Sequence, residues 1–283
     1  MANALRKLTH EDYSVGWICA LPNPEMVVAQ AMLDEEHDIL PAADPGDTNT
    51  YLLGRIGSHN VVVACLPSGK PGIGPAAIVA KDMLRSFKRI RFGLMVGVGG
   101  GVGLPIADIR LGDIVVSQHS KKSPAIVQYD FGTSVQEGRF VCTNTLSVLP
   151  NVVLTAVSRI RSQHDLKDHN LAHHLSEMVR DYPKLAPSYQ YQGFTNDHLF
   201  KADYIHINDK ESCEDCCSIL DENIVPRDRR ADNSPVIHYG TIGSANRVVR
   251  DSTLRDAWAK EQNIICYEME AAGNCAPAPP FCW

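Results

Sequence analysis

Three short blocks of the sequence combine residue types that could bind and act on a small polar ligand. The first block, residues 93–117 (GLMVGVGGGVGLPIADIRLGDIVVS), places a glycine cluster between two apolar, strand-like runs. Glycines at the carboxyl end of a strand let backbone N–H groups approach a phosphate, a ribose or a water molecule closely. We therefore predict ligand contacts at the glycines of this cluster: Gly97, Gly99, Gly100 and Gly101. A tight turn without a ligand is the alternative.

The second block, CYEMEAAG, has two carboxylates around a methionine at the end of an apolar run. Burying Glu268 and Glu270 there without partners would be costly, which favours a functional reason for both. A carboxylate that points into a pocket can accept both hydrogen bonds of a ribose cis-diol. Met269 between them can offer an apolar, polarisable face to the sugar or base. An ordinary helix-capping glutamate is the alternative.

The third block, VGWICALPNPEM, places Glu25 just after the first strand-like run. Open α/β sheets bind ligands beyond the carboxyl ends of their strands, so Glu25 is a candidate catalytic residue, although it could equally cap its helix. The glycine cluster is neither a P-loop, since no GK[ST] follows it, nor a dinucleotide fingerprint, since no helix opens directly after it.

The elements that must position these residues follow an alternating pattern. Strands are expected over 14–21, 51–56, 60–66, 92–98, 113–118, 125–130, 236–244 and 264–268, and helices over 25–36, 75–87, 150–163 and 252–261. The alternation predicts one α/β domain, with a central mixed, largely parallel sheet flanked by helices. Residues 181–235 are polar and weakly periodic, and we interpret them as a long insertion. Three prolines in the last seven residues predict that the tail, 274–283, adds no further strand or helix.

Charge and apolar patterning exclude several partners. The net charge is −6 and the basic residues are scattered, so polymeric nucleic acid is not expected to bind. The most apolar run, 92–107, is too short to span a membrane, and the first residues lack a secretory signal, so we expect a cytoplasmic protein with reduced cysteines.

One cysteine group has a spacing that zinc sites use. Cys213, Cys216 and Cys217, with His206 upstream, contain a C-x2-C pair. Because no matching second pair accompanies it, the sequence favours no metal site and no cofactor.

An ordered series of motifs indicates a family. These motifs are GWICALP, DTNTY, ACLPSG, RFGLMVGVGGGV, DIRLGDIVVS, VQYDFG, VIHYGTIGS and CYEMEAAG. From Tyr13 to Gly273 the chain resembles the nucleoside phosphorylase/nucleosidase family, most closely its fungal purine/uridine phosphorylase-like domain. The resemblance implies cleavage of the N-glycosidic bond of a purine nucleoside or nucleotide by water, or by phosphate as co-substrate, in a homo-oligomer.

The resemblance also implies roles for individual residues. Glu270 would hold the ribose hydroxyls, with Met269 against the sugar and Glu268 nearby. Glu25 and the glycine loop would face the attacking nucleophile, and an acid at this position suits the hydrolytic branch.

The base and the rest of the substrate would meet other motifs. Ser244, Ala245 and Asn246 in GTIGSAN would line the purine, with Arg247 as an alternative phosphate contact. Ser68 in ACLPSG completes the expected substrate-binding set.

Two departures from the family pattern bear on activity. Asn23 and Pro24 both stand between ALP and EM, where the fungal pattern has one residue. After EMEAAG the family continues with a helix, a strand and an aspartate that protonates the purine, and this sequence has none of them. We therefore expect a truncated domain, and hold a catalytically inactive nucleoside-binding or regulatory module as the second hypothesis.

Overall fold

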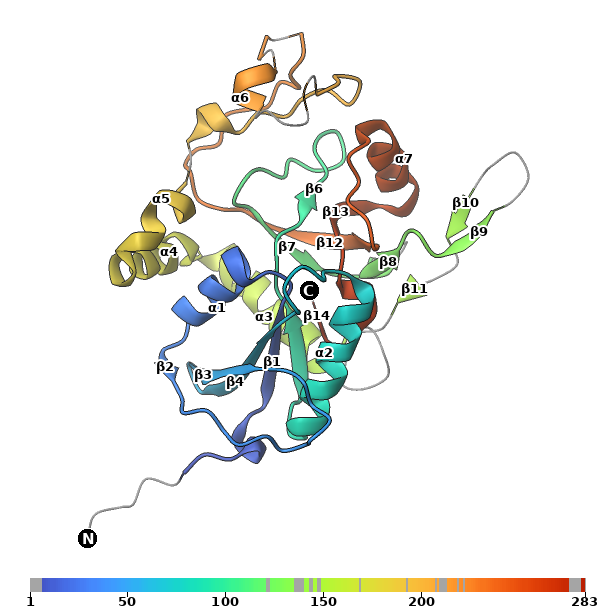
Figure 1. The fold of residues 1–283 in the computed structure, drawn as a ribbon. Helices are drawn as coiled ribbons and strands as arrows, with labels where there is room; N and C mark the ends of the chain where they lie inside the picture. The colour runs from blue at the N-terminus through green and yellow to red at the C-terminus, as the bar shows by residue number, and fades with distance from the viewer. Residues whose placement is uncertain are drawn as a thin grey trace.

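The computed structural model describes residues 7–120, 123–134, 140–142, 145–146, 149–167, 169–191, 193–206, 208, 213–217, 219–220, 222–274 and 281–282. These residues form a mixed α/β domain in which two six-stranded sheets lie between helices (Figure 1). The predicted fold class is confirmed, with the strands divided between two sheets rather than joined in one.

The first sheet has the strand order β14-β5-β1-β4-β3-β2. Its strands are β1 (Val15–Cys19), β2 (Glu35–Glu36), β3 (Tyr51–Ile56), β4 (His59–Cys65), β5 (Phe92–Met95) and β14 (Phe281–Cys282). Strand β1 runs parallel to both β4 and β5, and β3 and β4 form the expected antiparallel hairpin. Gly57 makes the hairpin turn with φ 58°, a left-handed conformation that favours glycine.

Helices α2 (Ile73–Ser86) and α1 (Val27–Ala31) pack on opposite faces of this sheet. Side chains alternate along β1 as the period of a strand requires. Ile18 packs with Val79 and Met83 of α2, while Trp17 lies in a second buried cluster with Ala29 of α1. Both faces are therefore apolar, which explains why β1 has no polar side chain.

The helix expected over 25–36 is shorter in the structure. A π-helical segment, η2 (Pro22–Met26), leads into α1, which ends at Ala31, and β2 follows. After α1 the backbone bonds to β3 instead of continuing the helix, since Asp34 N donates to Arg55 O at 2.8 Å. The helical spacing of apolar residues could not reveal this competing sheet edge.

The second sheet has the order β11-β8-β12-β13-β6, and β7 pairs with the first half of β12. Its strands are β6 (Gly100–Gly101), β7 (Ile114–Ser117), β8 (Ile126–Gln128), β11 (Thr145–Leu146), β12 (Ile237–Ser244) and β13 (Ile264–Glu268). Strands β9 (Gly132–Ser134) and β10 (Phe140–Cys142) form a separate ribbon. Helix α7 (Ser252–Gln262) covers this sheet and begins at the expected cap, because the Asp251 side chain accepts from Leu254 N at 2.9 Å.

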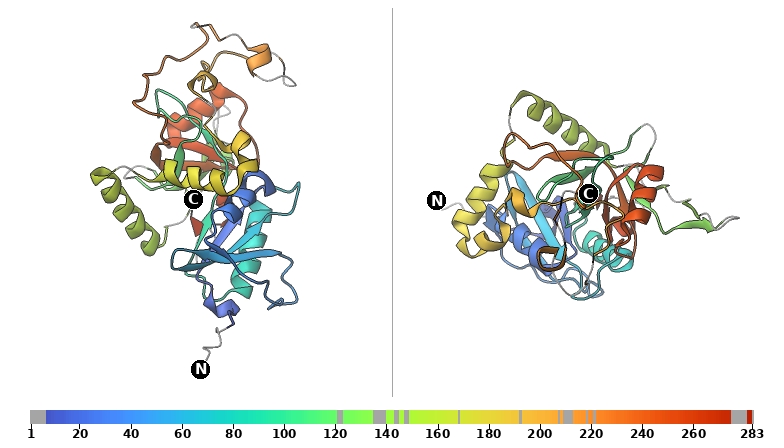
Figure 2. Two further views of the ribbon diagram at one scale, coloured as in Figure 1. Left: turned by 90° about the vertical axis from the view of Figure 1, so that its left-hand side faces the viewer. Right: turned by 90° about the horizontal axis from the view of Figure 1, so that it is seen from above.

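The remaining elements are helices, and several lie in the predicted insertion. They are η1 (His10–Asp12), α3 (Asn151–Leu166), α4 (Leu171–Asp181), η4 (Pro183–Leu185), α5 (Ala186–Tyr189), η5 (Phe194–Asn196), α6 (Cys213–Cys216) and η6 (Ala271–Asn274). The segment that carries α6 projects from the rest of the chain (Figures 1 and 2). Its two ends meet, because Phe200 bridges Ile224 and the Arg227 guanidinium pairs with the Asp197 carboxylate at 3.2 Å.

The tail differs from the expectation that it adds no strand. Phe281 and Cys282 form β14, which runs parallel to β5 beside Gly93 and Leu94. Residues 275–280 and 283, which belong to the same predicted tail, lie outside the described residues. Over the part of the chain that is described, no helix has the length and apolar character to cross a membrane.

Candidate active site

The η2 segment holds the Glu25 carboxylate against the end of β1 and the glycine cluster. Oε2 of Glu25 accepts from Ala20 N at 2.6 Å and Leu21 N at 3.1 Å, and Oε1 accepts from Val98 N at 3.0 Å. The side chain is only 8% exposed. One carboxylate thus bonds to the backbone just before and at the start of η2 and, at the same time, to the loop of the glycine cluster.

Two glycines of the cluster, Gly99 and Gly101, are required for close packing. Gly100 and Gly101 form β6, which pairs antiparallel with the end of β13. A Cβ at Gly99 would lie 2.5 Å from the Cys266 sulfur, and one at Gly101 would lie 2.6 Å from the Ile109 side chain. Gly99, Gly100 and Gly101 are also exposed on their other side, whereas Gly97 is half-buried. Half of the cluster is therefore strand, and the loop proper is 96–99.

Glu268, at the end of β13, is a buried carboxylate with one oxygen unused. Oε2 accepts from Glu270 N at 2.7 Å and Ala271 N at 2.9 Å, which fixes the start of η6. Oε1 is buried and has no hydrogen-bond partner among the described residues. Burial raises the pKa of Glu268 to about 7, and the Ser244 hydroxyl and the two backbone N–H groups offset part of this effect.

Glu270 joins η6 to the start of α2. Oε1 accepts from Gly72 N at 3.0 Å, and Oε2 accepts from Met269 N at 3.2 Å. Burial raises the pKa of Glu270, these two bonds lower it, and the nearby negative charge of Glu25 raises it again. The effect of the Glu25 charge on Glu270 indicates that the two motifs approach each other, although they are far apart in the sequence.

Asn246 is the exposed member of the three residues expected at the base. Its Oδ1 accepts from Ile73 N at 2.9 Å, which gives α2 a second side-chain cap beside Glu270. Ser244 and Ala245 are fully buried, and the Ser244 hydroxyl oxygen accepts from Ala272 N at 3.0 Å. Ser244 therefore supports η6, and Ala245 packs in the buried cluster that includes Ala259 of α7.

Two glycines at this junction were not singled out by sequence reasoning. A Cβ at Gly273 would lie 2.0 Å from the Ile73 carbonyl oxygen, so η6 can approach α2 only because the EMEAAG motif ends in glycine. Gly72 has φ 115°, and a Cβ there would lie 2.7 Å from the Asn246 Oδ1. The sequence signal for this close approach is the placement of the two glycines, because Gly273 ends the EMEAAG motif and Gly72 directly precedes α2. Ser68 lies exposed in the loop between β4 and α2, and Met269 is half-buried.

The acid of the LGDIVVS motif has a structural role away from these carboxylates. Asp113 bonds to Arg230 Nη2 at 2.6 Å, His238 Nε2 at 2.9 Å and Val236 N at 2.9 Å. Burial raises the pKa of Asp113, but the bonds from Arg230, Val236 N, Arg110 N and His238 together hold it well below its ordinary value. This network attaches the returning end of the insertion to β7.

A large cavity lies beside η2 but is not formed by the expected site residues. It has a volume of about 1140 Å³ and is lined by Asn23 and Pro24 together with residues of α4, α5 and the loops 110–113 and 229–235. The Tyr189 hydroxyl of α5 donates to Asn23 Oδ1 at 2.9 Å across its edge. The two residues that precede Glu25 thus connect the carboxylate cluster to this cavity.

Comparison with known proteins gives one curated relative and several solved structures. No family model matches the chain. A protein of Hyaloscypha variabilis described as a nucleotide-binding leucine-rich repeat (NLR)-like protein is 38% identical over 283 residues, which are 97% of this chain and 27% of the relative. The chain therefore spans about a quarter of the length of that relative.

The solved structures decide the fold. A 5′-methylthioadenosine/S-adenosylhomocysteine nucleosidase from Neisseria meningitidis, in complex with methylthio-immucillin-A, superposes with a TM-score of 0.52 over 95% of this chain and 82% of its own, at 14% identity. The chain has the nucleoside phosphorylase/nucleosidase fold. Futalosine hydrolase of Helicobacter pylori gives 0.51 over 97% of this chain and 83% of its own, at 15% identity. The expected fold is thereby confirmed.

Proposed function

We propose that this chain binds a purine nucleoside or nucleotide beside Glu25, Glu268 and Glu270 and cleaves its N-glycosidic bond with water. The observation that carries the proposal is the set of partners of these three buried carboxylates. Their hydrogen-bond donors are backbone N–H groups and, for Glu268, also the Ser244 hydroxyl. Among the described residues, no lysine or arginine neutralises any of the three.

Uncompensated negative charge, to which Glu268 contributes only above about pH 7, suits the reaction. When a glycosidic bond breaks, positive charge develops on the sugar in an oxocarbenium-like transition state. Carboxylates fixed in advance in a low-dielectric site stabilise that charge without reorganising. The same negative charge would repel a phosphate dianion, which favours water over phosphate as the nucleophile.

The proposed roles follow from which oxygens remain available. Oε1 of Glu268 is a buried acceptor that a ligand hydroxyl or N–H could satisfy. Glu270 would accept from the ribose hydroxyls, with Met269 against the sugar, and Glu25 would orient the attacking water. Asn246 would meet the edge of the base, since it is the exposed residue of its segment.

The comparisons support this proposal through their names. The two solved structures are named as a nucleosidase and a hydrolase, and one contains methylthio-immucillin-A. We also propose that the chain self-associates, because its resemblance to the nucleoside phosphorylase/nucleosidase family implies a homo-oligomer.

A second candidate function is a nucleoside-binding regulatory module without turnover. It is favoured by the curated relative, in which the matched region is 27% of an NLR-like protein. In that setting, occupancy of the carboxylate site by a nucleoside would be the signal.

The test is direct. Folded protein is incubated with adenosine, inosine, AMP or ATP, with and without phosphate, and free base is measured by chromatography. We expect base release without phosphate and a loss of roughly 10- to 100-fold in kcat/KM for Glu270→Gln, because a hydrogen bond to a charged group contributes about 1.5–3 kcal/mol. Glu261→Gln, an exposed glutamate of α7, is the matched control.

Each other outcome has a definite meaning. Base release only with phosphate would replace hydrolysis by phosphorolysis. Nucleoside binding measured by calorimetry, without base release, would establish the binding module instead.

A further inference from the structure

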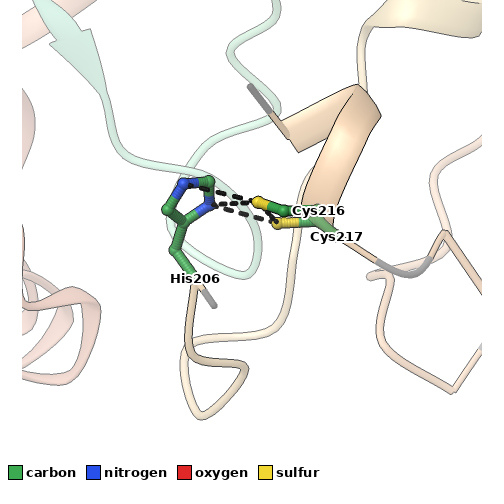
Figure 3. Close-up of side chains that lie close together, drawn as sticks. All are labelled: His206, Cys216 and Cys217. Carbon is green, nitrogen blue, oxygen red and sulfur yellow. Dashed lines mark hydrogen bonds between the residues drawn. The ribbon is translucent and has the colours of Figure 1, made fainter. Parts of the chain in front are cut away.

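His206, Cys216 and Cys217 converge in the projecting segment (Figure 3). His206 Nδ1 lies 3.1 Å from the Cys217 sulfur and 3.8 Å from the Cys216 sulfur, and the two sulfurs are 3.8 Å apart. Both cysteines are half-buried. One imidazole nitrogen and two thiol sulfurs, all possible metal ligands, thus lie close together. His206 precedes Cys216 by ten positions and Cys217 by eleven.

Two of these three separations are close to those of ligands around a single tetrahedral zinc ion. Zn–S bonds of about 2.3 Å and Zn–N bonds of about 2.05 Å at tetrahedral angles place two sulfurs about 3.8 Å apart, and a sulfur and a nitrogen about 3.6 Å apart. The observed S···S separation equals the first value, and the two N···S separations lie on either side of the second.

We propose that this cluster binds one Zn²⁺ through His206 Nδ1 and the sulfurs of Cys216 and Cys217. The fourth ligand is assigned from sequence to Cys213, which lies three residues before Cys216 in α6. C-x2-C is the spacing that zinc sites use. The sequence contains no second spaced pair of ligands, but in the structure His206 and Cys217 lie beside Cys216.

The ligand types select zinc among the common divalent ions. Thiolate and imidazole ligands suit zinc, whereas magnesium and calcium require oxygen ligands. Each cysteine binds as a thiolate, so zinc uptake releases protons and zinc affinity falls as the pH is lowered.

A cross-link would stabilise this segment, in which the described residues form little regular secondary structure. Between Phe200 and Ile224 the described regular element is α6, and four residues are too few for a stable isolated helix. The apolar side chains of Ile205 and Leu220 are 81% and 59% exposed, so they contribute little core. Zinc would join the part of the segment that leads away from the domain, at His206, to the part that returns, at Cys216 and Cys217.

The zinc site would stabilise a segment that touches the domain at its base. Leu199 fills the space beside Gly103, and the Ser252 hydroxyl at the start of α7 donates to Ala202 O. Figure 1 shows α6 at the outer edge of the molecule, beyond β6 and α7 and far from α2. We therefore assign the ion a structural role, independent of the carboxylate site.

The experiment measures metal in the full chain, purified under reducing conditions without a metal-affinity step. We expect about one zinc per chain by elemental mass spectrometry, and less than a tenth of that in His206→Ala, Cys216→Ser and Cys217→Ser. Cys142→Ser and His173→Asn, which alter a half-buried thiol and an exposed histidine outside the cluster, should keep the metal. Replacement by Co²⁺ should give the thiolate charge-transfer and tetrahedral d–d absorption bands, weakened in Cys213→Ser.

Zinc removal adds a structural readout. Chelation should increase protease cleavage between residues 200 and 224 while the far-UV circular dichroism of the sheets is retained. Absence of zinc from the wild-type chain together with no Co²⁺ bands would overturn the site, as would zinc retained in the triple variant of His206, Cys216 and Cys217. Unchanged metal content and Co²⁺ spectrum in Cys213→Ser would remove Cys213 as the fourth ligand.

Discussion

Replacing Glu268 by glutamine should make the folded domain more stable at neutral and alkaline pH. The Glu268 side chain is buried, its Oε1 has no partner among the described residues, and burial raises its pKa to about 7 from an ordinary value of 4.5. The folded chain therefore keeps a proton on Glu268 up to about pH 7, whereas the unfolded chain loses it near pH 4.5. Between these values the folded state binds more protons, so the free energy of unfolding falls as the pH rises and levels off above pH 7.

The size of the effect follows from the difference in pKa. A difference of 7 minus 4.5, or 2.5, corresponds to about 3 kcal/mol at 1.36 kcal/mol per pKa unit. Glutamine is neutral at every pH, so the stability of Glu268→Gln should exceed that of wild type by only about 1 kcal/mol at pH 5 but by about 3 kcal/mol at pH 8. The matched control is Glu261→Gln, which alters an exposed glutamate of α7.

The assay is urea denaturation at pH 5, 6, 7 and 8 for the three proteins, followed by circular dichroism. The quantity of interest is the difference in unfolding free energy between Glu268→Gln and wild type, because the other titrating groups cancel in it. A difference that stays constant across this range would refute the reasoning. A confirmed effect would mean that wild type retains a destabilising acid, as expected of a residue kept for ligand binding.

Three further substitutions test the packing and charge of the site and its support. Gly273→Ala should destabilise the domain by about 3 kcal/mol or more, because its Cβ would lie 2.0 Å from the Ile73 carbonyl oxygen; urea denaturation at pH 7 measures the loss, and wild-type stability would contradict the contact. Gly99→Ala should cost about 1–3 kcal/mol through its contact with the Cys266 sulfur, and adding Cys266→Ala should recover part of that cost, so strict additivity of the two changes would count against it. Asp113→Asn should cost roughly 3 kcal/mol at pH 7 by leaving its arginine partner without a counter-charge. The pKa of Asp113 is lower in the folded chain than the ordinary value of 3.8. The ionised Asp113 therefore stabilises the fold above pH 3.8, and this stabilisation is lost as the pH falls through the folded pKa. The difference in unfolding free energy between wild type and Asp113→Asn should therefore become smaller in acid.

Much of the fold was predictable because single elements carried strong local signals. The buried strand at Ile264–Glu268 and the helix that Asp251 caps were predicted within one residue of their observed ends. Continuous apolar runs and a capping side chain are local, so the sequence expresses them directly. The helix predicted over 25–36 was wrong in its length for the opposite reason, because a distant part of the chain decides where it ends. Pairing of β2 with β3 ends α1 early.

The sequence was enough to predict which residues belong to the candidate site, but not how they are arranged in space. The sequence identified Glu25, Glu268 and Glu270, but their backbone donors come from segments up to 198 positions away in the sequence. The sequence could not show that Ser244 is fully buried, since a β-rich run can present either face. The meeting of His206 with Cys217 likewise depends on the bridge between Phe200 and Ile224, which has no local signal.

The ion pair between Asp197 and Arg227 has a consequence for how this chain can vary. Both side chains are less than a tenth exposed, and the pair closes the excursion where it leaves and re-enters the domain. An excursion whose two ends are already joined can change in length at small cost, because loop-closure entropy grows only with the logarithm of the number of residues. The stretch between residues 203 and 222, which lies beyond these joined ends, is therefore an exchangeable module: a short linker or an entire foreign domain could replace it, while the sheets that carry the three glutamates keep their geometry.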